Sequence, residues 1–181
     1  MIKFRFITSE EEDLIRQNID SKFGEGIFDK IKNDSQLIVA IGNWKEIFLI
    51  SPKLGEIFEK LRGIINPYFL GLYIGDISKN QFKIQINGFV LISQYTNRFV
   101  VVTNKGEQTA LYGRNIPISL IIKIEMQAKK GDFVIIKNQL NESLALGKFL
   151  IDSDKISKIN NPNKVIIKII SDLGWYIRKG K

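Results

Sequence analysis

The apolar residues in the C-terminal part of this 181-residue chain fall in short runs that alternate with turn residues. These runs cover residues 118–125, 133–137, 144–151 and 165–170. Closely spaced strands with turns between them favour a small β-barrel or pseudo-barrel. A short helix near 153–158 and a closing helix over 172–178, with Ser171 as its N-cap, complete the predicted unit.

The first part of the chain mixes helical and strand patterns. Thr8 and Glu11 have the spacing of a capping box, so a helix is predicted that ends at Gly24. A tight hairpin is predicted at Gly42-Asn43, because these residues can supply positive φ angles. The segment 87–95 fits either a strand or a buried helix. Further helices are predicted near 27–31 and 52–61, and strands over 2–6, 37–41, 44–50, 68–74, 82–86 and 98–103.

The distribution of charged residues changes at nearly the same place as the pattern of predicted helices and strands. Residues 1–100 hold 13 Lys and Arg against 12 Asp and Glu, whereas residues 101–181 hold 14 against 7. A basic module that follows a neutral one suggests an anionic partner for the basic part. The turn at Asn104 therefore marks the predicted boundary between an N-terminal domain, 1–103, and a C-terminal domain, 104–181.

Two residue types are missing, and this narrows the possible chemistry. The chain has no cysteine and no histidine, which excludes disulfides, thiolate nucleophiles, sulfur metal sites and the commonest general base. No metal and no cofactor is expected. No apolar run approaches the roughly 20 residues of a membrane-spanning helix, and the first residues alternate apolar with basic side chains. We expect a cytoplasmic, monomeric protein without membrane contacts.

The segment 105–116, K-G-E-Q-T-A-L-Y-G-R-N-I, is the most specific motif of the chain. It resembles the segment that opens the RNA-binding PUA domain in the Nip-seven family of ribosome biogenesis factors. Residues 67–75 resemble an apolar strand of that family, and residues 172–178, D-L-G-W-Y-I-R, resemble its closing helix. Gly131-Asp132-Phe133-Val134 and Leu146-Gly147 resemble PUA turn and strand signatures. The likeness follows the whole chain in order and is that of an archaeal-like member.

The resemblance implies an α+β protein with an N-terminal α/β domain, built on a mainly antiparallel sheet, and a C-terminal PUA pseudo-barrel. It implies a non-enzymatic factor in the assembly of the large ribosomal subunit and in rRNA processing. The expected partners are precursor rRNA or other single-stranded RNA at the PUA domain, and ribosome assembly proteins at the N-terminal domain. The location would be nucleolar if the source were eukaryotic.

The resemblance places RNA contacts around the strand 144–151 and the helix that follows it. Lys155 and Lys158 are three residues apart, so both ammonium groups share one helix face, and Lys148 is expected beside them. Where some relatives have a basic pair directly after Gly147-Lys148, this chain has Phe149-Leu150. The candidate phosphate contacts are therefore Lys148, Lys155, Lys158 and Lys164.

Arg114 and Gly113 complete the candidate RNA-binding residues. The planar guanidinium of Arg114 can hold a phosphate with two hydrogen bonds or stack on an unpaired base. Gly113 allows close approach of a backbone, although a purely conformational role is the simpler interpretation. Tyr112 could be a stacking platform, but its apolar neighbour favours a place in the core. Lysines on a short helix commonly form a solvated face without binding anything.

Two other functions compete with this hypothesis. PUA domains also accompany RNA-modifying enzymes, so the chain could be such an enzyme or an accessory subunit of one. About a hundred residues before the PUA domain are few for a catalytic domain, and no glycine-rich loop between strand and helix indicates a nucleotide cofactor. A purely protein-binding adaptor would leave the basic excess of the C-terminal part without a partner.

Overall fold

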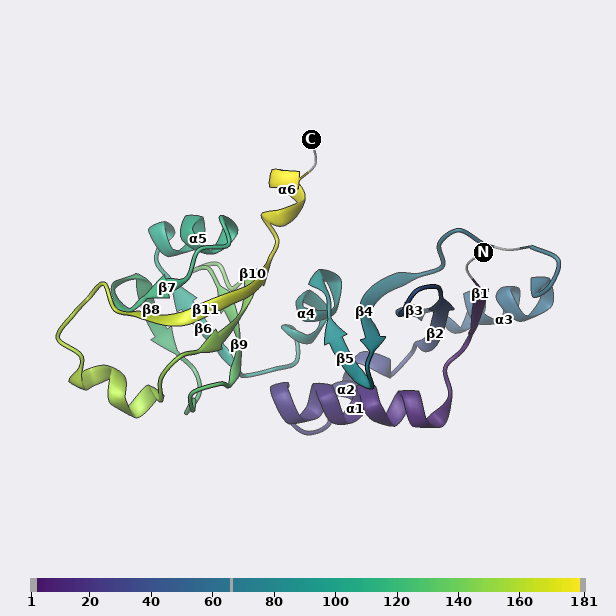
Figure 1. Ribbon diagram of the computed structural model, residues 1–181, viewed down its shortest axis with the longest axis horizontal. Helices are drawn as coiled ribbons and strands as arrows, with labels where there is room; N and C mark the ends of the chain where they lie inside the picture. Colours follow the sequence, from purple (N-terminus) through teal and green to yellow (C-terminus); the bar gives the residue numbers. More distant parts are fainter. Residues whose placement is uncertain (1–2, 66, 180–181) are drawn as a thin grey trace. The chain divides into compact units, whose positions relative to one another are not determined.

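The computed structural model describes residues 3–65 and 67–179 (Figure 1). The chain divides into two compact units, Met1–Tyr95 and Thr96–Lys181. This division precedes the expected boundary at Asn104, because strand β6 (Phe99–Val102) pairs with two strands of the second unit. The sequence indicated this strand correctly, but its partners are distant in the chain and give no local signal.

The first unit contains a five-stranded sheet in the order β1-β2-β3-β4-β5, in which every neighbouring pair is antiparallel. Its strands are β1 (Lys3–Phe6), β2 (Gln36–Ile41), β3 (Lys45–Ile50), β4 (Leu72–Ser78) and β5 (Gln81–Ile84). Residues 37 to 40 are all buried, because side chains of β2 pack on both faces of the sheet. The predicted antiparallel N-terminal sheet is confirmed.

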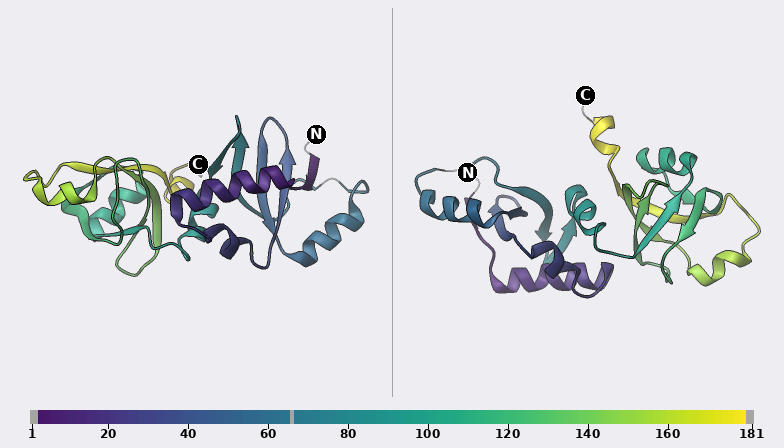
Figure 2. Two further views of the ribbon diagram at one scale, coloured as in Figure 1. Left: turned by 90° about the horizontal axis from the view of Figure 1, so that it is seen from below. Right: turned by 180° about the vertical axis from the view of Figure 1, so that it is seen from behind.

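Four helices accompany this sheet: α1 (Ser9–Phe23), α2 (Ile27–Lys32), α3 (Pro52–Leu61) and α4 (Ile86–Ile92). Helix α1 lies across one face of the strands (Figure 1, Figure 2). The capping box is present, since the Thr8 side chain accepts a hydrogen bond from the Glu11 amide and the Glu11 side chain accepts one from the Thr8 amide. Phe58 of α3 packs in a core cluster with Phe4 and Phe48.

Two local predictions for the first unit need correction, and one open alternative is resolved. The loop at Gly42-Asn43 is one residue longer than predicted, because Ile41 pairs with Lys45. The turn with two left-handed residues lies instead between β4 and β5, where Lys79 and Asn80 have φ angles of 49° and 56°. The strand predicted over 68–74 begins only at Leu72, and the ambiguous segment 87–95 contains most of helix α4.

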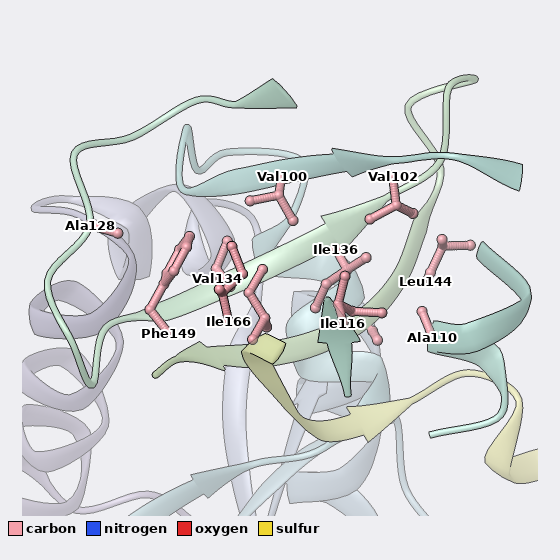
Figure 3. Packing of buried hydrophobic residues seen from close by; sticks show 12 residues of the cluster. Val100, Val102, Ala110, Ile116, Ala128, Val134, Ile136, Leu144, Phe149 and Ile166 are labelled. Atoms are coloured by element: carbon pink, nitrogen blue, oxygen red, sulfur yellow. The ribbon is translucent and has the colours of Figure 1, made fainter. Parts of the chain in front are cut away.

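The second unit is a near-barrel of six strands in the order β7-β11-β10-β9-β6-β8. The remaining strands are β7 (Ile116–Pro117), β8 (Ile121–Ile124), β9 (Phe133–Lys137), β10 (Ser143–Phe149) and β11 (Val165–Asp172). Val100, Val134, Ile136, Phe149 and Ile166 fill its interior, all at most 1% exposed (Figure 3). The pair β6 and β9 is parallel, and the other pairs are antiparallel. The predicted pseudo-barrel is confirmed.

Short helices complete this unit: α5 (Asn104–Leu111), the 3₁₀ helices η1 (Ile118–Leu120) and η2 (Ser153–Lys158), and α6 (Trp175–Lys179). The predicted strand 118–125 is divided into η1 and β8. Ser171 is not an N-cap, because β11 continues through it to Asp172 and α6 starts only at Trp175. Within the described residues, none of the helices is long and apolar enough to cross a bilayer.

Candidate nucleic-acid interface

The two structural units separate the charge more sharply than the predicted boundary did. The unit up to Tyr95 contains 12 Lys and Arg against 12 Asp and Glu, and the unit from Thr96 contains 15 against 7. The whole formal excess of +8 therefore belongs to the near-barrel. The net positive charge of this unit attracts a polyanion and raises the rate of encounter.

Lys148 lies on the outer face of the near-barrel, next to a second lysine. In the antiparallel pair of β10 and β11 it stands directly opposite Lys168. The neighbours Phe149 and Ile167 are buried in the core, so the alternation of a strand turns both lysines outward. The ammonium of Lys148 lies 4.7 Å from the centre of the Phe133 ring. Like charges opposite each other destabilise a sheet, and a bound anion would relieve this repulsion.

Lys155 and Lys158 share one face of η2, because side chains three residues apart eclipse each other in a 3₁₀ helix. Both are exposed, and Lys155 has a carboxylate partner, Asp152, at 2.6 Å. This hydrogen bond lowers the pKa of the Asp152 carboxyl and raises the pKa of the Lys155 ammonium. Within the part of the chain that the structure describes, Lys158 has no such partner, so η2 presents one paired and one unpaired ammonium group.

The backbone brings two further lysines to the start of η2. Ala128 and Ser153 exchange two hydrogen bonds of 2.8 and 3.0 Å, and the Lys130 amide donates to Asp152 at 2.8 Å. Lys129 and Lys130 are both exposed beside this contact. An open groove between the two segments is lined by Lys129 together with Gln127, Ala128, Asp152, Ser153 and Asp154.

Gly113 and Arg114 follow the end of α5. Gly113 has a left-handed backbone, with φ at +68°, and a Cβ there would lie 3.0 Å from a carboxylate oxygen of Asp172. Its position is therefore explained by backbone conformation and close packing. Arg114 is exposed, with its guanidinium 5.6 Å from the centre of the Tyr112 ring. Tyr112 is 63% exposed, so the interpretation of this ring as a core residue is wrong.

The structure places the candidate residues on separate elements of the near-barrel. Lys148 lies on β10 opposite Lys168, Lys155 and Lys158 lie on helix η2, and Gly113 and Arg114 lie beside α6. Helices η2 and α6 lie at opposite ends of the near-barrel (Figure 1, Figure 2). Lys164 is exposed in the turn before β11, and its carbonyl accepts a hydrogen bond from the Ile118 amide.

Sequence reasoning missed three basic residues of this surface: Lys129, Lys130 and Lys168. Lys168 could have been found only from the register of β10 and β11, which local patterning does not specify. Lys129 and Lys130 were visible as a basic pair before the turn Gly131-Asp132, but their position beside η2 depends on a long-range contact. Lys137, by contrast, lies in a buried contact with the Phe99 ring at 4.6 Å, and burial lowers its pKa.

The described ranges 3–65 and 67–179 contain no group of three acidic side chains that could hold a metal ion. In the same ranges, no carboxylate is ion-paired with Lys148, Lys158, Lys164 or Arg114. These four cations are available to an anionic ligand, and Lys155 becomes available when its contact with Asp152 opens.

The two units define a two-domain α+β protein with a neutral antiparallel module and a basic PUA-type near-barrel. Residues 98–181 match the family model of the UPF0113 PUA domain, and residues 4–86 match that of the NIP7/UPF0113 pre-PUA domain. The chain belongs to the NIP7/UPF0113 family, which confirms the resemblance noted in the sequence. NIP7/UPF0113 is a family of PUA RNA-binding proteins, so membership supports RNA binding.

A UPF0113 protein of Archaeoglobus fulgidus is 29% identical over 181 residues, which cover 98% of this chain and 96% of that protein. Among solved structures, a PUA domain of Aeropyrum pernix in complex with tartrate has a TM-score of 0.65 at 11% identity, covering 96% of this chain and 88% of its own. A hypothetical protein of Pyrococcus horikoshii has a TM-score of 0.63 at 16% identity and covers 94% of both chains. At such identities these two structures support the fold alone.

Proposed function

We propose that this chain is a non-enzymatic RNA-binding factor in large ribosomal subunit biogenesis, which binds precursor rRNA through its basic PUA domain. The observation that carries the proposal is the confinement of the whole +8 charge to the near-barrel. Phosphate groups supply the matching charge, and backbone contacts of this kind are largely independent of sequence.

The proposed phosphate track begins at the outward pair Lys148 and Lys168 and continues to Lys158 on η2. Lys155 joins it when phosphate replaces Asp152 as its partner. The first unit, which has no net charge, would serve contacts with ribosome assembly proteins. The protein would act as a cytoplasmic monomer that binds RNA and has no chemistry of its own.

The test is the binding of the full chain to a fluorescent single-stranded RNA over a range of salt concentrations. For about four neutralised phosphates, the single-strand slope of ~0.7 per contact predicts roughly fifty-fold weaker binding at 200 mM than at 50 mM salt. The variant Lys148→Glu, Lys155→Glu and Lys158→Glu should bind far more weakly and with a shallower salt slope.

The matched control replaces three exposed lysines of the first unit, Lys30, Lys53 and Lys60, by Glu, which changes the net charge by the same amount. An equal loss of RNA affinity in both triple variants would show that overall charge alone causes the effect, and would contradict the proposed site. Modification of a nucleotide in precursor rRNA by the wild-type chain would instead favour the RNA-modifying alternative. Stable protein complexes without any RNA binding would favour the adaptor.

A further inference from the structure

Exposed aromatic residues lie where α5 ends and where α6 begins. Helix α6 lies at the end of the near-barrel opposite to η2 (Figure 1, Figure 2). Tyr112 is 63% exposed, Trp175 44% and Tyr176 53%. The rings of Trp175 and Tyr176 meet edge to face with centroids 5.3 Å apart. Several large exposed rings on one part of a domain surface indicate a binding site more often than chance. We call Tyr112, Arg114, Trp175 and Tyr176 the aromatic surface.

Close backbone packing holds the two halves of this surface together. A Cβ at Gly174 would lie 1.9 Å from the carbonyl oxygen of Leu111, so only glycine fits there. Tyr112 directly follows Leu111 and Trp175 directly follows Gly174, so both residues lie next to this backbone contact. The packed backbone therefore brings the end of α5 and the start of α6, which carry these two residues, next to each other.

An ion pair fixes the same junction. The guanidinium of Arg178 donates to both carboxylate oxygens of Asp172, at 2.9 and 3.0 Å, and also donates to the Leu111 carbonyl. The hydrogen bond to Asp172 raises the pKa of Arg178, and the phenol of Tyr112 contributes in the same direction. Asp172 is buried and neutralised in this pair, so the charge that the surface presents to a ligand is positive.

We propose that the aromatic surface stacks unpaired bases of the single-stranded RNA whose phosphates bind the lysines of the near-barrel, an inference that rests on the proposed function. Aromatic rings and guanidinium planes are the groups on which proteins stack splayed bases. Arg114, with its guanidinium 5.6 Å from the Tyr112 ring centre, offers a cation beside a stacking ring. An apolar protein segment would leave this cation without a partner, whereas RNA supplies both a π-face and a phosphate.

Strand β11 connects the aromatic surface to the lysines. It begins after Lys164, carries Lys168 outward in its middle and ends at Asp172, immediately before the turn into α6. At about 3.3 Å per residue, a strand of 8 residues spans roughly 26 Å. A single RNA strand that follows β11 would thus bind phosphates first and place bases on the rings at the end.

The experiment uses Trp175 as its own reporter in the full chain. The chain contains two tryptophans, so the variant Trp44→Phe leaves Trp175 as the only indole. Titration with a single-stranded oligoadenylate should quench Trp175 fluorescence with the same midpoint as the binding curve. An abasic oligonucleotide of equal length should bind through its phosphates without this quenching. Bound oligoadenylate without quenching would overturn the stacking proposal and leave the proposed function intact.

Substitutions give a second, independent readout. Tyr112→Ala should weaken RNA binding roughly tenfold, as expected for the loss of one stacked base, while the salt slope stays unchanged because no charge is removed. Trp175→Phe keeps a ring and should retain most of the affinity that Trp175→Leu loses. Tyr68→Ala is the matched control, since Tyr68 is a 91% exposed tyrosine of the first unit. If Tyr112→Ala binds RNA as tightly as Tyr68→Ala, the aromatic surface is not a base-binding site. If neither the wild type nor any variant binds RNA, the proposed function itself is rejected.

Discussion

Lys148 of β10 and Lys168 of β11 stand directly opposite each other on the outer face of the near-barrel, although both carry a positive charge. Side chains in such a pair have Cβ atoms about 5 Å apart, and like charges at this distance destabilise the sheet by about a few tenths of a kcal/mol. The pair is unfavourable for the free protein and favourable for binding an anion, so stability and affinity should respond to substitution in opposite directions.

The variant Lys168→Glu tests this opposition. It converts the repulsion into an attraction, so the free energy of unfolding should rise by about 0.5 kcal/mol, while RNA affinity falls and the salt slope becomes shallower by about 0.7. Chemical denaturation and RNA titration measure the two effects. Lys53→Glu, at an exposed position of the first unit, is the control that should change neither. A variant that is less stable and binds RNA as tightly as the wild type would contradict the proposed role of the pair.

Local sequence signals predicted the elements of this fold where the physical cause is local. The capping box of Thr8 and Glu11 marked the start of α1, and Ser51 is the N-cap of α3 at the start of the helix predicted over 52–61. The same reasoning failed at the turn between β2 and β3. Gly42 and Asn43 can adopt positive φ angles but do not, whereas Lys79 and Asn80 in the turn between β4 and β5 do.

The candidate site was less predictable, because its geometry depends on contacts between distant segments. Lys168 became a neighbour of Lys148 only through strand register, and Lys130 reached η2 through its hydrogen bond to Asp152. The motif 105–116 and the closing segment 172–178 were identified from the sequence. Their meeting at Gly113 and Asp172, which builds the aromatic surface, required the structure.

Gly113 serves backbone geometry, and Gly113→Ala should therefore destabilise the second unit. The substitution adds a Cβ 3.0 Å from Asp172 at a residue with a left-handed backbone, which costs about 1 to 2 kcal/mol for conformation alone. Gly26→Ala separates the two causes, since Gly26 also has a left-handed backbone, with φ at +74°, but a Cβ added there would meet nothing within 4 Å. Thermal unfolding should show the larger loss for Gly113→Ala. Equal losses would mean that the contact with Asp172 is unimportant.

Glu11 makes the first unit sensitive to acid. Its carboxylate accepts hydrogen bonds from Arg5 at 2.6 and 2.8 Å and from Lys45 at 2.6 Å. The bond to Arg5 is the main cause that lowers the pKa of Glu11 from 4.5 to about 2. Because the folded pKa is the lower one, this stabilisation is complete above pH 4.5 and is lost as the pH falls towards 2.

The variant Glu11→Gln should lose about 2 kcal/mol of stability at neutral pH, a value that allows for solvent screening at the half-exposed Lys45. Urea unfolding between pH 6 and pH 2 measures the effect, and the curves of wild type and variant should converge at the acid end. Glu25→Gln changes an exposed glutamate of the same unit and should follow the wild type at every pH. A constant difference between wild type and Glu11→Gln down to pH 2 would show that packing, not charge, accounts for the loss.

Asp152 competes with RNA for the ammonium group of Lys155, so removing its charge should strengthen binding. The carboxylate holds Lys155 at 2.6 Å and also accepts a hydrogen bond from the Lys130 amide. In Asp152→Asn the amide oxygen can still accept from Lys130, while Lys155 is released and the net charge of the surface increases by one.

RNA affinity of Asp152→Asn should rise a few-fold at 50 mM salt, and the gain should shrink at 200 mM because a phosphate contact is screened. Asp132→Asn, in the neighbouring turn, adds the same charge without releasing Lys155 and should show a smaller gain. Weaker binding by Asp152→Asn would mean that the carboxylate positions η2 for RNA and does not compete with it.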